Sequence, residues 1–369
     1  RVYGVERTVC EPAGFEEFRI EESDSTPGGV PVMLPDLAPC PECLEEMRDP
    51  FSRRYHYPFT NCTHCGPRYS IIETMPYDRA GTSMKGFRMC PECRREYQDV
   101  EDRRFHAQPI GCPSCGPSVK VLFSDGSELG FGHGFDTPAA QVAWVLADGL
   151  IVALLGVGGF QLLADASSEA AVRRLRRLKE RDAKPFAVMV SDEAAAERLC
   201  RLSEEEKRLL ASPAAPIVLA RGRKDVDLAP SVCMFSRFVG IMLPSSPLHA
   251  LLMDVWGRPL VVTSGNLSGE PLCISVEEGL EKLGHVADVF LVHDRPVVRP
   301  VDDSVVRVAD GRAMMVRRAR GYAPRPVWRT SAAAPDVLAL GAGLKNTICW
   351  LKRGVAVMSQ HLGDLSSAA

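Results

Sequence analysis

The chain has 369 residues, of which 46% are hydrophobic and 25% charged, and its formal net charge is −3. This composition is that of a globular protein and argues against a disordered or fibrous chain. A slightly acidic chain is not expected to bind nucleic acid over its whole surface. The longest apolar run, residues 150–160, is shorter than the roughly 18 residues of a membrane span, so no membrane association is predicted. The length predicts two or three domains.

Residues 1–24 form the first unit, because a partly alternating apolar pattern at 14–20 predicts one closing β-strand. A segment rich in Pro, Gly and Ser follows at 23–39 and predicts a linker. The chain starts at Arg1 rather than Met, and its last segment resembles the start of another domain. We therefore interpret it as part of a longer protein.

Four Cys-x-x-Cys pairs between residues 25 and 118 form a duplicated module with an offset of 50 residues. Each repeat reads C-x2-C-x18-C-x2-C, and two such pairs supply the four corners of a closed, tetrahedral zinc site. The clustering predicts metal in a reducing, cytoplasmic setting, with redox or disulfide use as the alternative. Pairing within each repeat follows from the duplication, and interleaved pairing between repeats is the alternative. The predicted ligands are Cys40, Cys43, Cys62, Cys65, Cys90, Cys93, Cys112 and Cys115.

The duplication extends beyond the cysteines, since Arg53-Arg54 recurs as Arg103-Arg104 and His56 as His106. These basic residues and their aromatic neighbours have two interpretations: they grip nucleic acid or a protein partner, or the module is a rigid spacer whose folding depends on metal. We favour a spacer or docking role. The histidines are expected outside the ligand set, because each repeat already offers four sulfur atoms.

Helical and strand patterns alternate from residue 119 to 328. Helices are predicted at 137–147 and 168–179, with Thr137 and Pro138 starting the first. Short apolar strands are predicted at 150–155, 185–190, 217–220, 259–262 and 289–292. The fold class is therefore α+β: the zinc-knuckle module, then an α/β domain with a twisted sheet. A second linker, 324–335, leads to a last unit at 329–369 with a strand at 337–340.

A basic helix and the turn after it carry the first candidate site. Lys179, Arg181 and Lys184 precede the apolar strand at 185–190, so they lie near a strand end where cations can clamp the phosphates of a nucleotide. The alternative is a solvated basic face.

Two polar loops complete the candidate site. Thr263, Ser264 and Asn266 follow an apolar strand, and such a loop either wraps an adenylate or is a plain polar turn. Asp302 and Asp303 either hold Mg²⁺ against a polyphosphate or form a structural ion pair with nearby arginines. The remaining candidates are Ser304, Arg307 and Arg317. The glycines at 156–159 do not fit a dinucleotide fingerprint, because position 161 is Gln.

Together these motifs resemble the HypF family of hydrogenase maturation carbamoyltransferases. The similarity covers practically the whole chain. The matching segments are the duplicated cysteine pattern and residues 103–109, 184–189, 243–249, 263–266, 302–305, 317–322 and 359–364. The resemblance implies that 1–24 ends an acylphosphatase-like domain, that 119–328 is a YrdC-like domain, and that 329–369 begins a carbamoyltransferase domain.

The resemblance also implies a chemistry. The family forms a carbamoyl adenylate from carbamoyl phosphate and ATP, releases pyrophosphate, and passes the carbamoyl group to the C-terminal cysteine of HypE for cyanide ligand synthesis. It implies Zn, ATP and Mg²⁺ as cofactors, and Lys179 and Arg181 as catalytic residues opposite Ser264 and Asn266. The sequence departs from the family pattern at Leu155, Gln161 and Gly343, where the family has Lys, His and Glu.

Two further functions remain open on the residues alone. One is a YrdC-like RNA-binding or tRNA-modifying protein, motivated by the basic helix, although binding to nucleic acid is the less favoured interpretation. The other is a small-molecule O-carbamoyltransferase, which keeps the adenylating chemistry and uses a hydroxyl acceptor.

Overall fold

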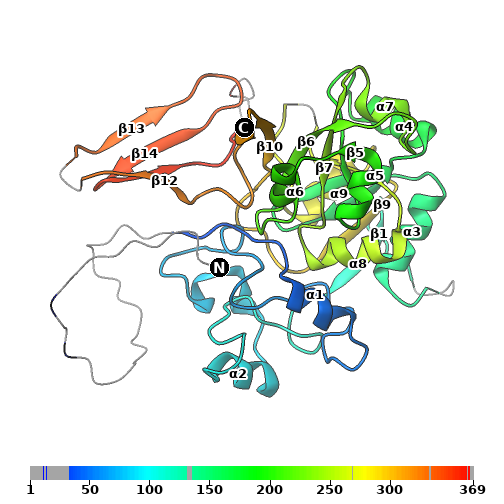
Figure 1. Cartoon of the computed structure of the whole chain (residues 1–369). Helices are drawn as coiled ribbons and strands as arrows, with labels where there is room; N and C mark the ends of the chain where they lie inside the picture. Colours follow the sequence, from blue (N-terminus) through cyan, green and yellow to red (C-terminus); the bar gives the residue numbers. More distant parts are fainter. Residues whose placement is uncertain are drawn as a thin grey trace.

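The structure is a computed structural model that describes residues 33–130, 135–267, 269–331 and 334–363, with Glu11, Gly14 and Leu365. The strand predicted at 14–20 therefore lies outside the described residues. A finger module, a large mixed sheet with helices on both faces, and a small C-terminal sheet follow one another along the chain (Figure 1). None of the described helices is long and apolar enough to cross a membrane.

The finger module repeats one local structure twice. Its helices α1 (Pro41–Arg48) and α2 (Pro91–Gln98) each begin after the first cysteine of a repeat, with Pro at the first helical position. His56 and His106 adopt the same left-handed backbone, with φ of 53° and 51°. Two short 3₁₀ turns, η1 (Arg79–Gly81) and η2 (Ser83–Gly86), lie between the repeats. The backbone thus reproduces the offset found in the sequence.

The large sheet has the order β1-β9-β2-β3-β8-β4-β7-β6-β10-β11, with β5 paired to β6. Three neighbouring pairs are parallel (β2 with β9, β4 with β7, β6 with β10) and the others antiparallel. Its strands are β1 (Val119–Phe123), β2 (Val152–Leu155), β3 (Phe160–Asp165), β4 (Ala187–Met189), β5 (Cys200–Arg201), β6 (Ile217–Gly222), β7 (Phe238–Met242), β8 (Leu260–Ser264), β9 (Val289–His293), β10 (Val305–Ala309) and β11 (Arg312–Arg317).

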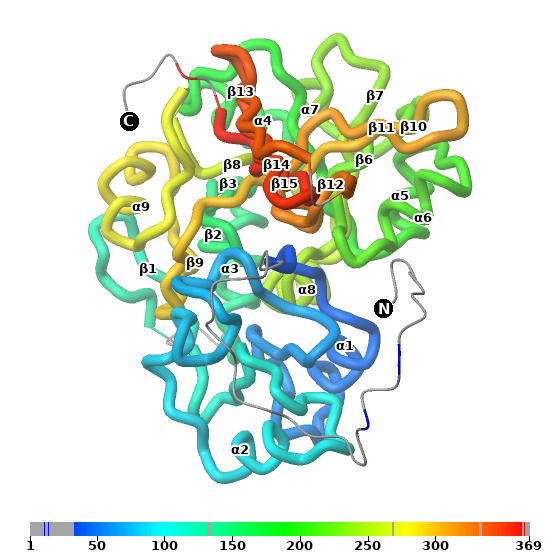
Figure 2. The backbone as a smooth tube through the Cα atoms, turned by 90° about the vertical axis from the view of Figure 1, so that its left-hand side faces the viewer, coloured from blue at the N-terminus to red at the C-terminus, as the bar shows by residue number. Residues whose placement is uncertain are grey.

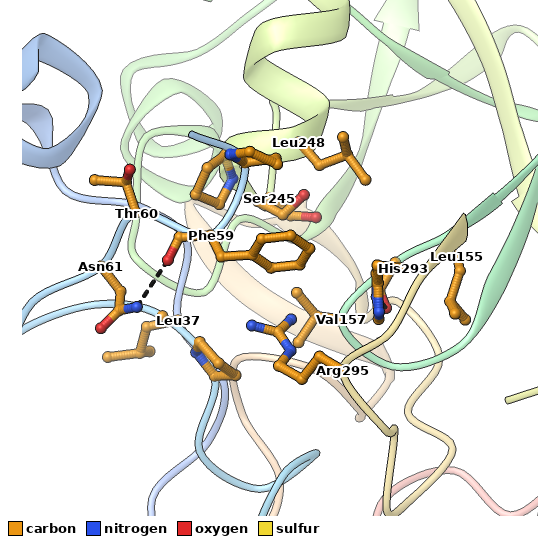
Figure 3. A pocket seen from close by; sticks show the side chains of 16 residues that line it. Leu37, Phe59, Thr60, Asn61, Leu155, Val157, Ser245, Leu248, His293 and Arg295 are labelled. Carbon is orange, nitrogen blue, oxygen red and sulfur yellow. Dashed lines mark hydrogen bonds between the residues drawn. The ribbon is translucent and has the colours of Figure 1, made fainter. Parts of the chain in front are cut away.

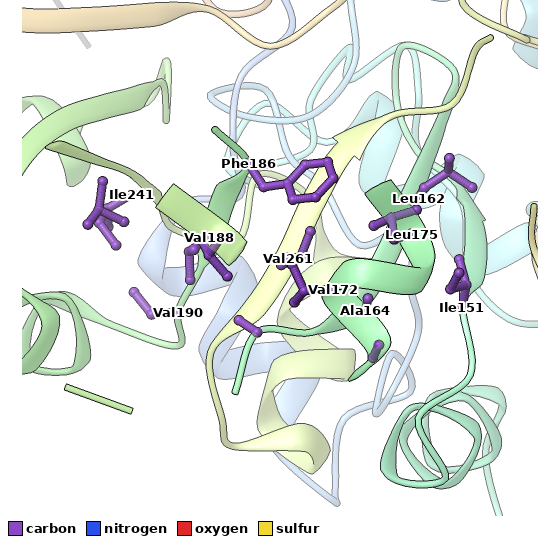
Figure 4. Close-up of a cluster of buried hydrophobic side chains, with 14 of the residues drawn as sticks. Ile151, Leu162, Ala164, Val172, Leu175, Phe186, Val188, Val190, Ile241 and Val261 are labelled. Carbon is purple, nitrogen blue, oxygen red and sulfur yellow. The ribbon is translucent and has the colours of Figure 1, made fainter. Parts of the chain in front are cut away.

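Alternate residues of the central strands point to opposite faces of the sheet, as the two-residue period of a strand requires. In β2, Ala153 and Leu155 join one buried cluster and Val152 and Leu154 the other. The first cluster (Figure 4) is covered by α4 (Glu169–Leu178), α5 (Glu193–Leu199), α6 (Glu204–Leu210), α7 (Pro230–Cys233) and α9 (Val276–Leu283). The second is covered by α3 (Pro138–Ala147) and α8 (Pro247–Trp256).

The finger module docks on the face formed by α3 and α8. Met47 of α1 packs with Ala139, Ala250 and Leu251 in a separate apolar cluster, and Arg48 pairs with Asp254 of α8 at 2.7 Å. Figure 2 shows the module lying against this side of the sheet domain. The finger loop also meets the sheet itself, because the Phe59 ring lies edge to face with His293, the last residue of β9, at 5.4 Å.

The small C-terminal sheet is antiparallel, in the order β12-β15-β14-β13. Its strands are β12 (Pro326–Arg329), β13 (Val337–Leu340), β14 (Ile348–Lys352) and β15 (Val355–Met358). Strand β13 confirms the strand predicted at 337–340. The prediction of a linker across 324–335 is wrong at 326–329, because these residues pair with β15. Proline starts this edge strand, where its missing N–H costs no ladder hydrogen bond.

Candidate nucleotide site and metal centres

The cations after helix α4 meet the turn after strand β8. Ser168 caps the start of α4 and Lys179 ends it. The Lys179 ammonium donates to the carbonyls of Ser264 and Asn266, both at 2.6 Å, and to Oδ1 of Asn266 at 3.1 Å. Arg181 donates to Thr263 Oγ1 at 3.2 Å. The structure therefore brings together the two groups of residues that the sequence separates by more than 80 positions.

No carboxylate among the described residues bonds to these cations. Arg181 donates otherwise to the carbonyls of Lys184 and Pro185, at 3.0 and 2.6 Å, and its guanidinium lies 4.8 Å from the ring of Phe186. Lys179 is 6% exposed, and burial together with the Arg181 charge lowers its pKa to about 7. Burial likewise lowers the pKa of Arg181 to about 10. The arrangement is a buried positive site that an anion would stabilise.

A small cavity, of about 20 Å³, is lined in part by Ser264. Glycines at the β2–β3 turn form one wall, and Ser264, Asp302 and Asp303 form another. His249 also lines it, with Nδ1 3.3 Å from Ser245 Oγ and no partner for Nε2 within the described chain. Burial lowers the pKa of His249 to about 4, so it is neutral near pH 7. Neither Lys179 nor Arg181 is among the residues that line this cavity.

The two aspartates are tied to arginines. Asp303 accepts from Arg320 Nε at 2.9 Å and from Gln161 Nε2 at 2.7 Å. Asp302 accepts from Arg317 and from the backbone N–H of Asp303. With all four carboxylate oxygens engaged, the pair forms the structural ion pairs and does not fit a Mg²⁺ site in this arrangement.

Two other predicted site residues lie outside both groups. Ser304 is fully buried and bonds to the backbone of Ala319 and Arg320, which fixes the strand rather than facing a ligand. Arg307 is exposed on β10, where its guanidinium lies 5.7 Å from the ring of Phe238. Lys184 is exposed, and its backbone carbonyl accepts hydrogen bonds from Arg181 and Arg176.

Each repeat gathers its own four sulfur atoms. In the first repeat the Sγ–Sγ distances are 3.6 Å for Cys40–Cys62, 3.8 Å for Cys62–Cys65 and 3.6 Å for Cys43–Cys65. A tetrahedron of thiolates about 2.3 Å from zinc has edges of about 3.8 Å, whereas a disulfide is about 2.05 Å long. The second repeat has distances of 3.6 to 3.8 Å. The geometry fits two structural zinc ions paired within repeats.

Each repeat donates hydrogen bonds from an arginine to a cysteine sulfur atom of the other repeat. Arg53 donates to Cys93 Sγ of the second repeat at 3.4 Å, and Arg103 donates to Cys43 Sγ of the first at 3.1 Å. Arg54 and Arg104, 1% and 4% exposed, pair with Glu96 and Glu46. These arginines offset thiolate and carboxylate charge inside the module, so they are not free to grip a nucleic acid.

Comparison with known proteins covers each part of the chain. Residues 40–72 and 89–122 match the family model "HypF finger", 144–319 match "Telomere recombination" and 332–369 match "HypF Kae1-like domain". A carbamoyltransferase HypF of Synechocystis is 48% identical over 96% of this chain. A crystal structure of full-length HypF in the phosphate- and nucleotide-bound form is 47% identical, with a TM-score of 0.88 over 92% of the chain.

The chain belongs to the HypF family.

It spans about half the length of these HypF proteins, namely 46% of the Synechocystis protein and 44% of the crystallised chain. Within the YrdC-like part, a mouse threonylcarbamoyl-AMP synthase is 34% identical over 39% of this chain and 52% of its own length. The YrdC-like fold predicted from the motifs is thereby confirmed.

The departures from the HypF pattern have visible positions. Leu155 is the last residue of β2 and is 2% exposed, so this position carries no charge. The Gln161 side chain donates a hydrogen bond to Asp303. Ser245, His293 and Arg295 line cavities but were not predicted as site residues, and His249, which also lines one, was named only within the matching segment 243–249. The signal available for Arg295 was its place just after the buried strand β9, where a charged residue at a strand end is a candidate ligand group.

Proposed function

We propose that this chain is the carbamoyl-adenylate-forming part of a carbamoyltransferase of [NiFe] hydrogenase maturation. One observation carries the proposal: Lys179 is buried and Arg181 half-buried beside the Ser264–Asn266 turn, without a carboxylate to offset their charge in the described chain. Membership of the HypF family and the relative named threonylcarbamoyl-AMP synthase support the same class of chemistry.

In this scheme the residues of the chain bind and orient the two substrates. The ammonium of Lys179 and the guanidinium of Arg181 offset the charge of the ATP phosphates, while Ser264 and Asn266 hold the carbamoyl group. The carbamate oxygen then attacks the α-phosphorus in line, and pyrophosphate leaves with the bond electrons. Mg²⁺ enters as the ATP complex, since Asp302 and Asp303 are already paired.

The substrates and acceptor of the whole protein are part of the proposal. Carbamoyl phosphate is the proposed source of the carbamoyl group, and the C-terminal cysteine of HypE is the proposed acceptor. The zinc ions are proposed to stabilise the finger module, because their four-sulfur sites leave no open position for a substrate.

The observations do not favour the RNA-binding alternative. On the basic helix, Arg173 pairs with Glu169 and Arg174 with Asp288. The Arg176 side chain is bonded to the carbonyls of Ser231 and Val232. The charges of Arg173 and Arg174 are therefore offset by carboxylates, and the Arg176 side chain is buried.

Pyrophosphate exchange into ATP tests the proposal. We expect exchange that requires carbamate, supplied as ammonium bicarbonate, and that falls about 100-fold in Lys179→Ala, the scale of losing one charged transition-state contact. Arg173→Ala is the control, since it removes an exposed pair from the same helix. Exchange of equal rate without the carbamoyl donor would reject the proposal.

A further inference from the structure

The two cysteine clusters of the finger module differ in exposure, although their sequences are repeats. All four cysteines of the first cluster are buried, at between 1% and 7% exposure. In the second cluster Cys93 and Cys112 are buried, but Cys90 and Cys115 are half-buried. Helix α1 of the first repeat packs against α8, whereas α2 lies at the end of the module far from the sheet domain (Figure 1, Figure 2). Solutes in the surrounding water can therefore reach the second cluster more easily than the first.

A backbone bridge covers the first cluster. Leu37 and Gly66 exchange two backbone hydrogen bonds of 3.0 Å beside the second cysteine pair of this repeat. The next residue, Ala38, donates to the carbonyl of Pro213 in the sheet domain at 2.8 Å. Gly116, the counterpart of Gly66, donates instead within its own cysteine knuckle. The segment that covers the first cluster is thus anchored to the sheet domain, and the bonding at Gly116 does not repeat it.

One sequence difference between the repeats also favours access to the second cluster. The backbone N–H of Thr63 donates to the carbonyl of Arg103 at 3.1 Å. Its hydroxyl donates to the carbonyls of Arg103 and Phe105, at 3.0 and 2.9 Å. The same position of the second repeat is Pro113, which has neither an N–H nor a hydroxyl group. The second knuckle therefore lacks the bonds that tie the first knuckle to the opposite repeat.

We propose that the second cluster is a reversible oxidation site for hydrogen peroxide and related hydroperoxides, whereas the first cluster is structural. A thiolate of Cys90 or Cys115 attacks a peroxide oxygen, the O–O bond breaks, and a sulfenic acid and a hydroxide ion form. A neighbouring thiolate then attacks the sulfenic sulfur, the S–S bond forms, and a second hydroxide ion leaves. The two sulfur atoms together lose the two electrons that the peroxide gains.

Neighbouring sulfur atoms are close enough to complete the disulfide. Cys112 Sγ lies 3.8 Å from Cys90 Sγ and 3.7 Å from Cys115 Sγ, and Cys93 Sγ lies 3.6 Å from Cys115 Sγ. A disulfide bond is about 2.05 Å long, so each pair has to approach by less than about 2 Å. The new bond removes two of the four sulfur ligands, and the site then no longer holds its ion. The first cluster has similar spacings, so exposure decides which cluster reacts.

The second cluster also contacts the loop that docks on the sheet domain. The Tyr57 hydroxyl packs against Gly116 so closely that it leaves no room for a side chain there. The Tyr57 ring lies 5.7 Å from the ring of Phe59, which points toward His293 (Figure 3). A disulfide at Cys115 changes the backbone beside Gly116. We therefore expect oxidation to loosen the contact between the two modules.

Peroxide treatment of the zinc-loaded chain tests the proposal, with the first cluster as an internal control. A chelating dye measures zinc release, and alkylation with peptide mass spectrometry identifies the oxidised cysteines at partial reaction. We expect Cys90 and Cys115 to react about tenfold faster than their counterparts Cys40 and Cys65. Dithiothreitol and zinc should restore the starting chain. Equal rates in the two clusters, earlier oxidation of the first, or irreversible sulfinic acid at the second would overturn the proposal.

A variant tests whether the bonds of Thr63 protect the first cluster. Thr63→Val removes the hydroxyl and keeps the N–H, so it should raise the oxidation rate of the first cluster about threefold, the scale of one weak hydrogen bond. Ser114→Ala, which removes an exposed hydroxyl from the second knuckle, should change neither rate. An unchanged first-cluster rate in Thr63→Val would overturn the assignment of protection to these bonds.

Hydrogen exchange at residues 57–61 measures the effect on the docking loop. We expect faster exchange there in the oxidised chain than in the reduced chain, and equal exchange would contradict the link between the second cluster and the loop. None of these measurements uses ATP or pyrophosphate, so this proposal and the proposed adenylation fail separately.

Discussion

The finger module and the site of Lys179 and Arg181 beside the Ser264 turn both bury positive charge, but the charge is offset in opposite ways. In the module, Arg54 and Arg104 form ion pairs with glutamates. Arg53 and Arg103 donate to cysteine sulfur atoms. Beside the Ser264 turn, Lys179 and Arg181 donate only to carbonyl, amide and hydroxyl oxygens. Paired cations hold a fold together, whereas unpaired ones retain affinity for an anion. Whether a basic residue is structural or binds an anion therefore depends on whether an acidic group is paired with it.

Removal of zinc should have the largest effect. Structural zinc contributes about 10–16 kcal/mol of apparent folding free energy in finger peptides. Because each repeat donates an arginine to a cysteine of the other, we expect Cys93→Ser to release both ions, measured by native mass spectrometry and thermal unfolding. Cys349→Ser, outside the clusters, should keep both. A stable Cys93→Ser chain with one zinc and unchanged Tm would show that the repeats are independent.

Breaking one buried pair in the module should come next. Arg104→Gln removes one of the positive charges that offset the Glu46 carboxylate. It also removes the Nε hydrogen bond to the backbone carbonyl of Asn61. Loss of one member of a buried pair costs about 3–5 kcal/mol, which urea unfolding would measure. Arg95→Gln, on the exposed side of α2, should change the free energy of unfolding by less than about 0.5 kcal/mol. An equal loss of unfolding free energy in the two variants would contradict the difference between the buried, paired arginine and the exposed one.

The pH dependence of ATP binding should sharpen the description of the Lys179 and Arg181 site. The Lys179 pKa of about 7 means that the ammonium loses its proton as pH rises through neutrality. A polyphosphate prefers the charged form, so its affinity should fall by up to about tenfold per unit above that pH. Calorimetry from about pH 6 to about pH 9 would measure the slope. Lys179→Arg should flatten it, because guanidinium stays charged, and an equal slope in both proteins would exclude Lys179 as its source.

The smallest effect is expected at the exposed pair on the basic helix. Arg173 and Glu169 are four residues apart, and Arg173 is 73% exposed. Such pairs contribute about 0.3–0.5 kcal/mol, so Arg173→Ala should leave urea unfolding almost unchanged. A loss above about 1 kcal/mol would show that the helix depends on this charge.

Local signals predicted much of the fold. The N-cap Thr137 and the apolar periodicity of the two segments located α3 and α4 to within a residue, and the offset of 50 residues predicted both zinc clusters. Strand β12 was missed, since its pairing with β15 depends on residues about 30 positions away.

The candidate site was predictable only in part, for the same reason. Motifs predicted the meeting of Lys179 with the Ser264 turn, but no local pattern distinguishes a paired aspartate from a free one. Asp303 is fixed by Gln161 and Arg320, and Arg295 faces Phe59 of another module. These contacts form only when the chain folds.

Calorimetric titration with ATP of Arg181→Gln against Arg174→Gln tests the central claim most directly. Both substitutions remove an arginine from the same basic segment, but Arg174 is already paired with Asp288, whereas Arg181 bonds only to uncharged oxygens. We expect Arg181→Gln to weaken ATP binding by about 10- to 100-fold, the scale of one charged hydrogen bond, and Arg174→Gln to leave Kd unchanged. Equal affinities in the two variants would contradict the account.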